Sequence, residues 1–322
     1  MQSSSALFPV TLHSAELCAG LNEDVYLLKP GNSPDPSVTL AVTRLSHGKG
    51  GVPVILLHGS FSNRRFWCSP RGVGLGAMLA REGFDVWIAE MRGHGLSPRN
   101  QAYNSNTVAD YARYDLPAIA AFVMEQAGGQ KPHWIGHSLG GITLAAAIGG
   151  EYLSEHEAHS VTLFGAQVSR VYWPLKLPPV AWGSRFVLKR LGMIPGRRLK
   201  RGPEDEPLGL ALETLRWHQL FGRFGDADKD WWFGLTQAKV PLLAVAGEGD
   251  HQDPAWCCRK LAEQYGATPR YFLSLGKSAG FSHNFGHVDM LISKAAQEEV
   301  WPLVSHWLRE QDSPHGAAQR LD

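Results

Sequence analysis

Short apolar stretches alternate with longer amphipathic stretches along the chain from residue 25 onward. The apolar stretches, which we expect to form strands, are Val52–Gly59, Phe84–Glu90, His133–Gly136, Ser160–Ala166, Val240–Asp250 and Arg270–Leu275. A strand covered on both faces shows a continuous apolar run, whereas a strand with one solvated face alternates. Because these runs are continuous, they predict a mostly parallel, twisted sheet with helices on both faces.

The stretches between these runs have the length and periodicity of helices. The helices that we expect are Gly74–Glu82, Val108–Gln126, Ser138–Ile148, Pro254–Tyr265 and Ala295–Glu310. Before the first parallel strand, the turn-rich segment PGNSPDPS separates two short apolar runs, and this predicts an antiparallel pair formed by Val25–Leu28 and Leu40–Leu45. The order of the elements therefore favours an α/β fold.

One interval, residues 167–239, does not follow the alternation. It is too long for an ordinary connection between two elements of a compact domain. Its tryptophans are Trp173, Trp182, Trp217, Trp231 and Trp232. We therefore expect residues 167–239 to form an inserted helical cap, or lid, over a core made of residues 1–166 and 240–310, with residues 311–322 as a flexible tail.

Composition excludes several classes of protein. The chain has 322 residues with Lys+Arg 31 and Asp+Glu 30, so it lacks the strong positive charge that nucleic-acid binding requires. Its four cysteines are scattered and include no C-x-x-C pair, which favours reduced thiols over a disulfide framework or a zinc site. The N-terminal residues do not resemble a secretory signal, and no apolar run is long enough for an integral membrane segment. We expect a cytoplasmic protein without a nucleic-acid partner; the oligomeric state stays open.

The clearest candidate for chemistry is G-x-S-x-G at Gly136–Gly140, directly after a predicted strand and directly before a predicted helix. In that setting the pattern is typical of a nucleophile elbow, a strained turn that presents Ser138. Side chains at Gly136 and Gly140 would collide with the neighbouring strand or helix. Ser138 would also lie at a helix N-terminus, where developing negative charge is favoured.

A serine hydroxyl needs a base, and the base needs an orienting group. On a fold with this elbow, the acid and the histidine should follow the serine in that order, each after a later strand. Asp250 ends the strand Val240–Asp250, and His287 follows the next strand. Asp253 is the alternative acid, although we expect it to cap the helix that begins at Pro254. His283 is the alternative histidine.

Two backbone N–H groups would be needed to stabilise an oxyanion. The amide of Leu139 follows the nucleophile directly. The second amide should come from the loop after the strand that ends at Gly59, through Ser60, with Phe61 as the alternative.

Several motifs together resemble the α/β-hydrolase superfamily, from about Val25 to Glu310. The matching pieces are HGSF (His58–Phe61), EMRGHGLS (Glu90–Ser97), GHSLGG (Gly136–Gly141), GEGD (Gly247–Asp250) and GHVDM (Gly286–Met290). The second piece has Glu90 where the family has Asp, a change we expect to affect only a structural loop. The segment YARYDLPA, which begins at Tyr111, and the His-x-Asp formed by His287 and Asp289 are similar to lipase-like members.

This resemblance implies a hydrolase that cleaves carboxylic esters with an apolar acyl or alcohol part. The reaction would pass through an acyl-enzyme on Ser138, with His287 as the base and Asp250 as the acid that orients it. Thioesterase, C–C bond hydrolase, peptidase and cofactor-free perhydrolase activities are alternatives on the same residues. A ligand receptor that retains the fold is an alternative of another class. No cofactor or metal is implied. We expect substrate contacts from Phe61, His137, Trp173 and Trp217.

Three other patterns compete with this interpretation. Gly72–Ala77 matches G-x-G-x-x-A, but the sequence before it is loop-like, so a dinucleotide site is not favoured. His156 and His159 share a helix face with Glu155, but no further ligand accompanies them. They are therefore better explained as solvated residues than as a metal site. The basic run between Arg185 and Arg201 could attract anionic lipids or the phosphates of an acyl-CoA, but we favour a solvated loop.

Overall fold

The computed structural model describes residues 9–48 and 50–322 and contains a sheet of ten strands. The strands of this sheet, in spatial order, are β1 (Val10–Cys18), β2 (Leu21–Leu28), β3 (Leu40–Ser46), β5 (Asp85–Glu90), β4 (Pro53–Leu57), β6 (His133–His137), β7 (Ser160–Phe164), β10 (Leu242–Gly247), β11 (Arg270–Leu275) and β12 (Gln319–Arg320). Two further strands, β8 (Met193–Ile194) and β9 (Glu206–Pro207), pair with each other in the insertion.

The strands from β5 to β11 run parallel and form the centre of the sheet. β1, β2 and β3 pair antiparallel at one edge, with Val25 opposite Thr43. The α/β fold, the parallel centre and the antiparallel pair are thus confirmed. β1 was not predicted, and residues 311–322, which we expected to be flexible, include β12, which pairs antiparallel with Tyr271 and Phe272 of β11.

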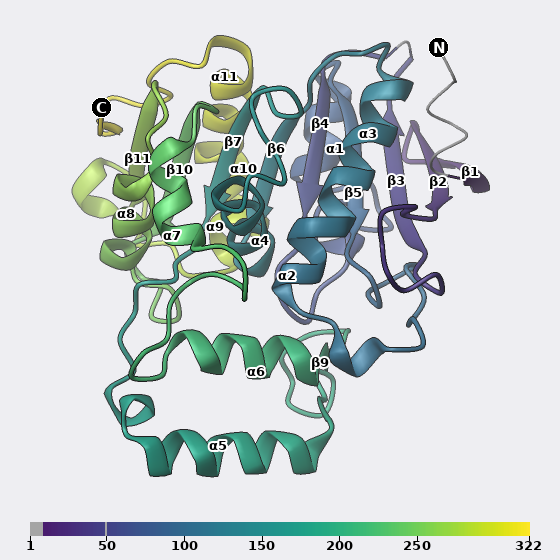
Figure 1. The fold of residues 1–322 in the computed structure, drawn as a ribbon. Coiled ribbons are helices and arrows are strands. Elements are labelled where there is room, and N and C mark those ends of the chain that lie inside the picture. Colours follow the sequence, from purple (N-terminus) through teal and green to yellow (C-terminus); the bar gives the residue numbers. More distant parts are fainter. Residues whose placement is uncertain (1–8, 49) are drawn as a thin grey trace.

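Helices cover both faces of the sheet (Figure 1). They are α1 (Leu75–Arg81), α2 (Val108–Asp110), α3 (Leu116–Gln126), α4 (Leu139–Gly149), α8 (Ala255–Gln264), α9 (Asp289–Ile292), α10 (Lys294–Glu299) and α11 (Trp301–Glu310). Side chains along a strand alternate between the two faces. In β4, Ile55 and Leu57 accordingly join the apolar cluster beneath α3 and α4, whereas Val54 and Leu56 join the cluster beneath α1 and α11.

The interval 167–239, which we call the inserted segment, contains α5 (Pro178–Leu191), α6 (Leu208–Trp217) and α7 (Trp231–Gly234). Figure 1 shows α6 between the body of the protein and α5, which is the outermost helix. α7 instead lies against α4, where Gly149 and Gly234 allow the two backbones to touch. Among the described residues, no helix combines the length and apolarity needed to cross a bilayer.

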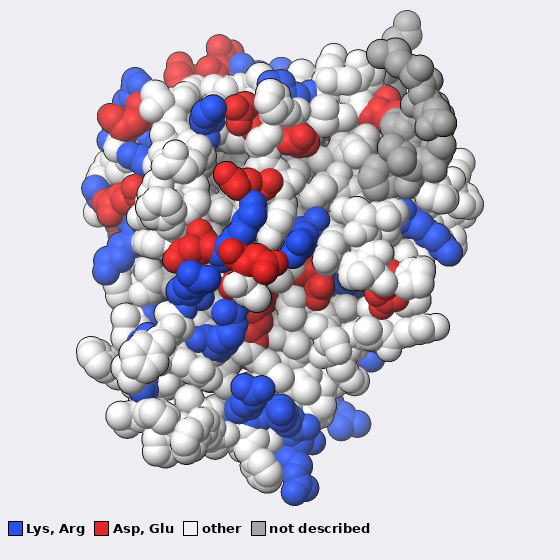
Figure 2. All heavy atoms as spheres, in the orientation of Figure 1, with Lys and Arg blue, Asp and Glu red and all other residues white. Residues whose placement is uncertain are grey.

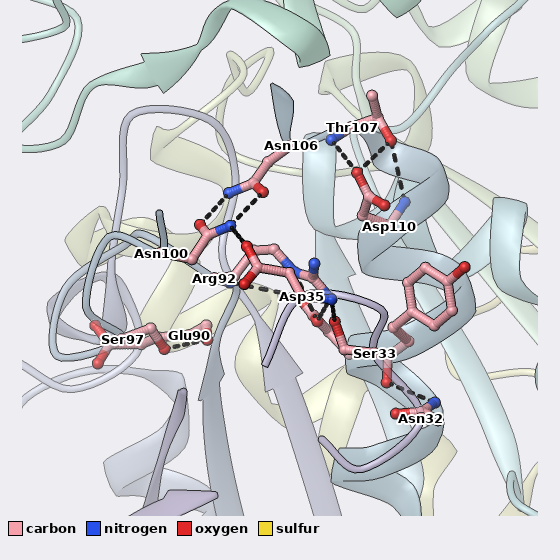
Figure 3. A network of polar contacts seen from close by, with 12 residues as sticks. Asn32, Ser33, Asp35, Glu90, Arg92, Ser97, Asn100, Asn106, Thr107 and Asp110 are labelled. Atoms are coloured by element: carbon pink, nitrogen blue, oxygen red, sulfur yellow. Dashed lines mark hydrogen bonds and ion pairs between the residues drawn. The ribbon is translucent and has the colours of Figure 1, made fainter. Parts of the chain in front are cut away.

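The loop after β5 is fixed by a polar network (Figure 3). Asn100 and Asn106 exchange amide hydrogen bonds, and Asn100 also donates to Asp35 over 2.8 Å. The carboxylate of Glu90 accepts hydrogen bonds from the backbone N–H groups of Arg64 and Leu96. The side chain of Glu90 therefore holds two loops together.

Candidate active site

Ser138 occupies a backbone conformation that a residue with a side chain rarely adopts. It lies between β6 and α4 with φ 51° and ψ −117°, and strain of this kind persists only where the surroundings enforce it. The flanking glycines permit the turn. A Cβ at Gly136 would lie 2.6 Å from the backbone of Gly140, and a Cβ at Gly140 would lie 2.6 Å from the carbonyl oxygen of Leu57, as the sequence predicted.

His287 is paired with Asp250. Its Nδ1 lies 2.7 Å from Oδ2 of Asp250, a carboxylate that is almost fully buried in the turn after β10, which ends at Gly247 rather than at Asp250. The other oxygen of Asp250 accepts from the backbone N–H groups of Gln252 and Asp253 at 2.9 and 2.8 Å. These bonds fix the carboxylate, so Nδ1 of His287 is held as the donor and Nε2 is left as the basic nitrogen.

Asp253 also faces His287, but its carboxylate is engaged elsewhere. Its Oδ2 lies 3.6 Å from Nδ1 of His287, and its Oδ1 accepts from Gln167 Nε2 at 2.9 Å. Burial raises the pKa of the Asp253 carboxyl. Our expectation that Asp253 caps α8 is wrong: that helix begins after Pro254 without a side-chain cap, because the Asp253 side chain turns toward Gln167.

Ser138 and His287 line one cavity, together with Ser60, Phe61, His137 and Gln252. Among the described residues, no hydrogen bond joins Ser138 to His287. The side-chain nitrogen of Gln252 lies 3.1 Å from Nε2 of His287. The alternative histidine, His283, pairs instead with Asp289 over 3.4 Å. The sequence offered no signal for Gln252, which belongs to the turn after Asp250 and to no motif.

The backbone N–H groups of Ser60 and Leu139 are available to donate hydrogen bonds to a ligand oxygen. Within residues 9–48 and 50–322, neither N–H donates a hydrogen bond, and both residues line a second cavity beside Ser138. Phe61, the alternative donor, has its N–H bound by the carboxylate of Glu206. This arrangement favours Ser60 over Phe61.

Glu206 connects the inserted segment to this loop. It lies on β9, is buried, and faces Nε2 of His94 at 3.2 Å while it accepts the N–H of Phe61. Burial alone would lower the pKa of His94, but the neighbouring Glu206 carboxylate raises it above its ordinary value. The sequence did not identify Glu206, since nothing distinguishes it there from its acidic neighbours Glu204 and Asp205.

This second cavity has a volume of about 770 Å³ and extends from Ser138 beneath the inserted segment. Its apolar lining includes Val168, Leu175, Leu188, Leu210, Leu215 and Trp217. Of the other expected substrate contacts, Phe61 also lines this cavity, whereas Trp173 is 76% exposed and lies outside it.

His137 lies next to His287. Its ring centroid is 4.7 Å from that of His287, and its Nε2 donates to the carbonyl oxygen of His287 over 2.8 Å. Burial lowers the pKa of His137 to about 3, so this imidazole is neutral and can position the loop that carries His287.

Comparisons with known proteins agree with this fold. The sequence model of the alpha/beta hydrolase fold family matches residues 52–184. Gastric triacylglycerol lipase of Rattus norvegicus is 36% identical over 117 residues, which are 31% of this chain and 29% of the lipase. The chain therefore matches less than a third of the length of the curated lipases that resemble it.

Solved structures match over most of the chain. A thermophilic esterase from Thermogutta terrifontis superposes with a TM-score of 0.59 at 18% identity, covering 87% of this chain and 96% of the esterase. DcsB, in complex with its substrate analogue, gives a TM-score of 0.65 at 15% identity, covering 92% of this chain and 99% of DcsB. Identities this low establish the fold alone. The sheet order, the turn at Ser138 and these matches together identify the chain as a protein of the α/β-hydrolase fold.

Proposed function

We propose that this protein is a serine hydrolase that cleaves carboxylic esters through an acyl-enzyme intermediate. The observation that carries the proposal is the pairing of His287 with a buried, doubly anchored Asp250 in the cavity that also contains Ser138. Similarity to lipases and esterases supports the same reaction class.

In the proposed reaction, Nε2 of His287 takes the proton of the Ser138 hydroxyl as its oxygen attacks the ester carbonyl carbon. The tetrahedral oxyanion accepts hydrogen bonds from the N–H groups of Ser60 and Leu139. The imidazolium then gives its proton to the leaving alkoxide, which departs as an alcohol. A water molecule, deprotonated by His287, hydrolyses the acyl-enzyme and releases the acid. Asp250 holds the imidazole in its working tautomer and stabilises its charged form.

Before the attack, the side chain of Gln252 must turn away from Nε2 of His287. The amide lies on an exposed turn, so a substrate that enters the cavity can displace it at little cost.

The apolar cavity supports a substrate with an apolar acyl or alcohol part. Transfer of each methylene from water into such a cavity contributes about 0.8 kcal/mol. The test is a series of p-nitrophenyl esters of increasing acyl length, measured beside matched acyl-CoA thioesters and peptide anilides. We expect kcat/KM for the esters to rise by up to about fourfold per added methylene until the cavity is full.

A variant of the cavity wall sharpens this test. Ala211 lines the cavity from α6, so Ala211→Phe should shorten the preferred acyl chain while leaving the acetyl ester almost unaffected. Turnover of thioesters or peptides well above that of every ester would contradict the proposed substrate class.

A further inference from the structure

The outer face of the inserted segment exposes large aromatic side chains that nothing in the described chain covers. They are Trp173, Trp182, Phe186 and Phe221, with exposed fractions of 76, 71, 61 and 94%. Single exposed apolar residues are ordinary on protein surfaces, but a concentration of them marks a site of interaction.

The geometry of α5 places two of these side chains, Trp182 and Phe186, on one face of the helix. Ala181 is the buried residue of this helix, and Leu188 points inward to the cavity that contains Ser138. Trp182 and Phe186 are four positions apart, so they share a face one turn from each other. The next turn adds Arg190, whose guanidinium carbon lies 5.1 Å from the centre of the Phe186 ring. Because α5 is the outermost helix in Figure 1, this face projects from the body.

The charged residues of the segment that carries α5 have a single sign. Residues 167–203 contain no Asp or Glu, whereas their exposed cations are Arg185, Lys189, Arg190, Arg197, Arg198, Lys200 and Arg201. None of these cations forms a salt bridge within the described part of the chain. Figure 2 shows the Lys and Arg side chains gathered at the lower end of the molecule, where Figure 1 places α5.

The groove beside Trp182 and Phe221 contains one acidic residue, and it is already engaged. Asp226 accepts hydrogen bonds from the Tyr152 hydroxyl over 2.8 Å and from the backbone N–H of Lys229 over 2.7 Å. Within the described residues, the exposed cations of the outer face therefore have no acidic partner.

Although the sequence alone favoured a solvated loop here, the exposed aromatic residues beside the basic run change that interpretation, and we propose that this outer face docks on the surface of an anionic phospholipid bilayer. Aromatic side chains enter the interface between headgroups and acyl chains, while Lys and Arg attract anionic lipids, and the two contributions add. A folded acidic protein would need a concave site to receive a projecting helix, whereas a bilayer accepts one directly. This inference does not depend on the proposed hydrolysis. In the docked protein, only the thickness of α5 would separate the lipid from the cavity wall at Leu188.

The test uses the full-length protein and vesicles, with co-sedimentation as the readout. Phosphatidylcholine vesicles are compared with vesicles containing equal amounts of phosphatidylcholine and phosphatidylglycerol, at low and high salt. The wild type should bind the anionic vesicles at least about tenfold more tightly, and high salt should weaken the binding.

Two matched double variants locate the surface. Phe186→Ser with Arg190→Glu alters the outer face, whereas Trp256→Ser with Lys260→Glu alters a comparable pair on α8, where the ammonium lies 5.0 Å from the indole ring centre. Both variants change the charge equally. The first should weaken vesicle binding at least about tenfold, and the second should leave it within about twofold. Circular dichroism checks that both variants are folded.

Three results would overturn the proposal. The first is equal binding of the wild type to neutral and anionic vesicles. The second is an equal loss of vesicle binding in the two double variants. The third is that the folded wild type binds no vesicles but does bind soluble polyglutamate. The last result would assign the face to an acidic protein partner instead.

Discussion

At the scale of single residues, two carboxylates compete for one imidazole nitrogen. Asp250 lies 2.7 Å from Nδ1 of His287 and has both oxygens in hydrogen bonds, whereas Asp253 lies 3.6 Å away and is held by Gln167. The shorter contact and the rigid anchoring favour Asp250 over Asp253 for the orienting role in the proposed reaction.

Substituting each carboxylate separately tests this assignment. Asp250→Asn should lower kcat for a p-nitrophenyl ester by about 10³- to 10⁴-fold, because the imidazole loses its working tautomer. Asp253→Asn should lower it by less than about tenfold, since the contact between Asp250 and His287 remains. A larger loss in the Asp253 variant, with thermal unfolding unchanged in both, would reverse the assignment.

The sequence pointed to some residues of the candidate site and gave no signal for others, for physical reasons. Ser138 and His287 became candidates because the glycines around the serine, and the order of strands that follow it, are local properties of the chain. Gln252 and Glu206 were missed because their contacts depend on how distant loops meet. The carboxylate of Glu206 reaches Phe61 and His94 across more than a hundred residues of sequence.

At the scale of elements, continuous apolar runs predicted the parallel strands well, and their ends differ by only a few residues from the expected ones. β1 was not predicted because its side chains are nearly all exposed, so no apolar pattern indicates a strand there. The predicted helix Val108–Gln126 is divided by a wider turn at Tyr111–Asp115, where Asp115 turns inward to bind Arg92. The predicted helix Ala295–Glu310 is divided at Val300, just before a proline-containing first turn.

α6 is joined to α2 by a buried carboxylate. Glu213 of α6 accepts the backbone N–H groups of Val108 and Ala109 at 2.6 and 3.4 Å, at the start of α2. Burial raises the pKa of Glu213 from 4.5 to about 7. Ionising this carboxyl therefore costs more in the folded protein than in the unfolded chain.

The pH dependence of unfolding tests this contact. The stability that protonated Glu213 contributes is fully present below pH 4.5 and is lost as the pH rises through about 7. As the pH rises from 4.5 to about 7, the melting temperature of Glu213→Gln should increase by at least about 2 °C relative to that of the wild type. The exposed Glu298→Gln variant serves as the control and should show no relative change. A constant difference between Glu213→Gln and the wild type at all pH values would contradict the raised pKa.

At the scale of the whole molecule, the parallel sheet and the inserted segment each supply part of the candidate site. The sheet carries Ser138 and Asp250 at the ends of β6 and β10, and the inserted segment completes the cavity with α5 and α6. The sequence predicted an insertion at this place. It could not predict that α7 would lie against α4 or that Glu206 would bind the loop beside Ser138, because both contacts arise only when the segment folds back on the body.

The most direct test of the central claim is covalent labelling with a fluorophosphonate, followed by peptide mass spectrometry of the wild type and of Ser138→Ala. A hydroxyl activated by His287 should become labelled at Ser138, and the folded Ser138→Ala variant should carry no label. A folded wild type that never labels, or a label that persists in the Ser138→Ala variant, would contradict the account.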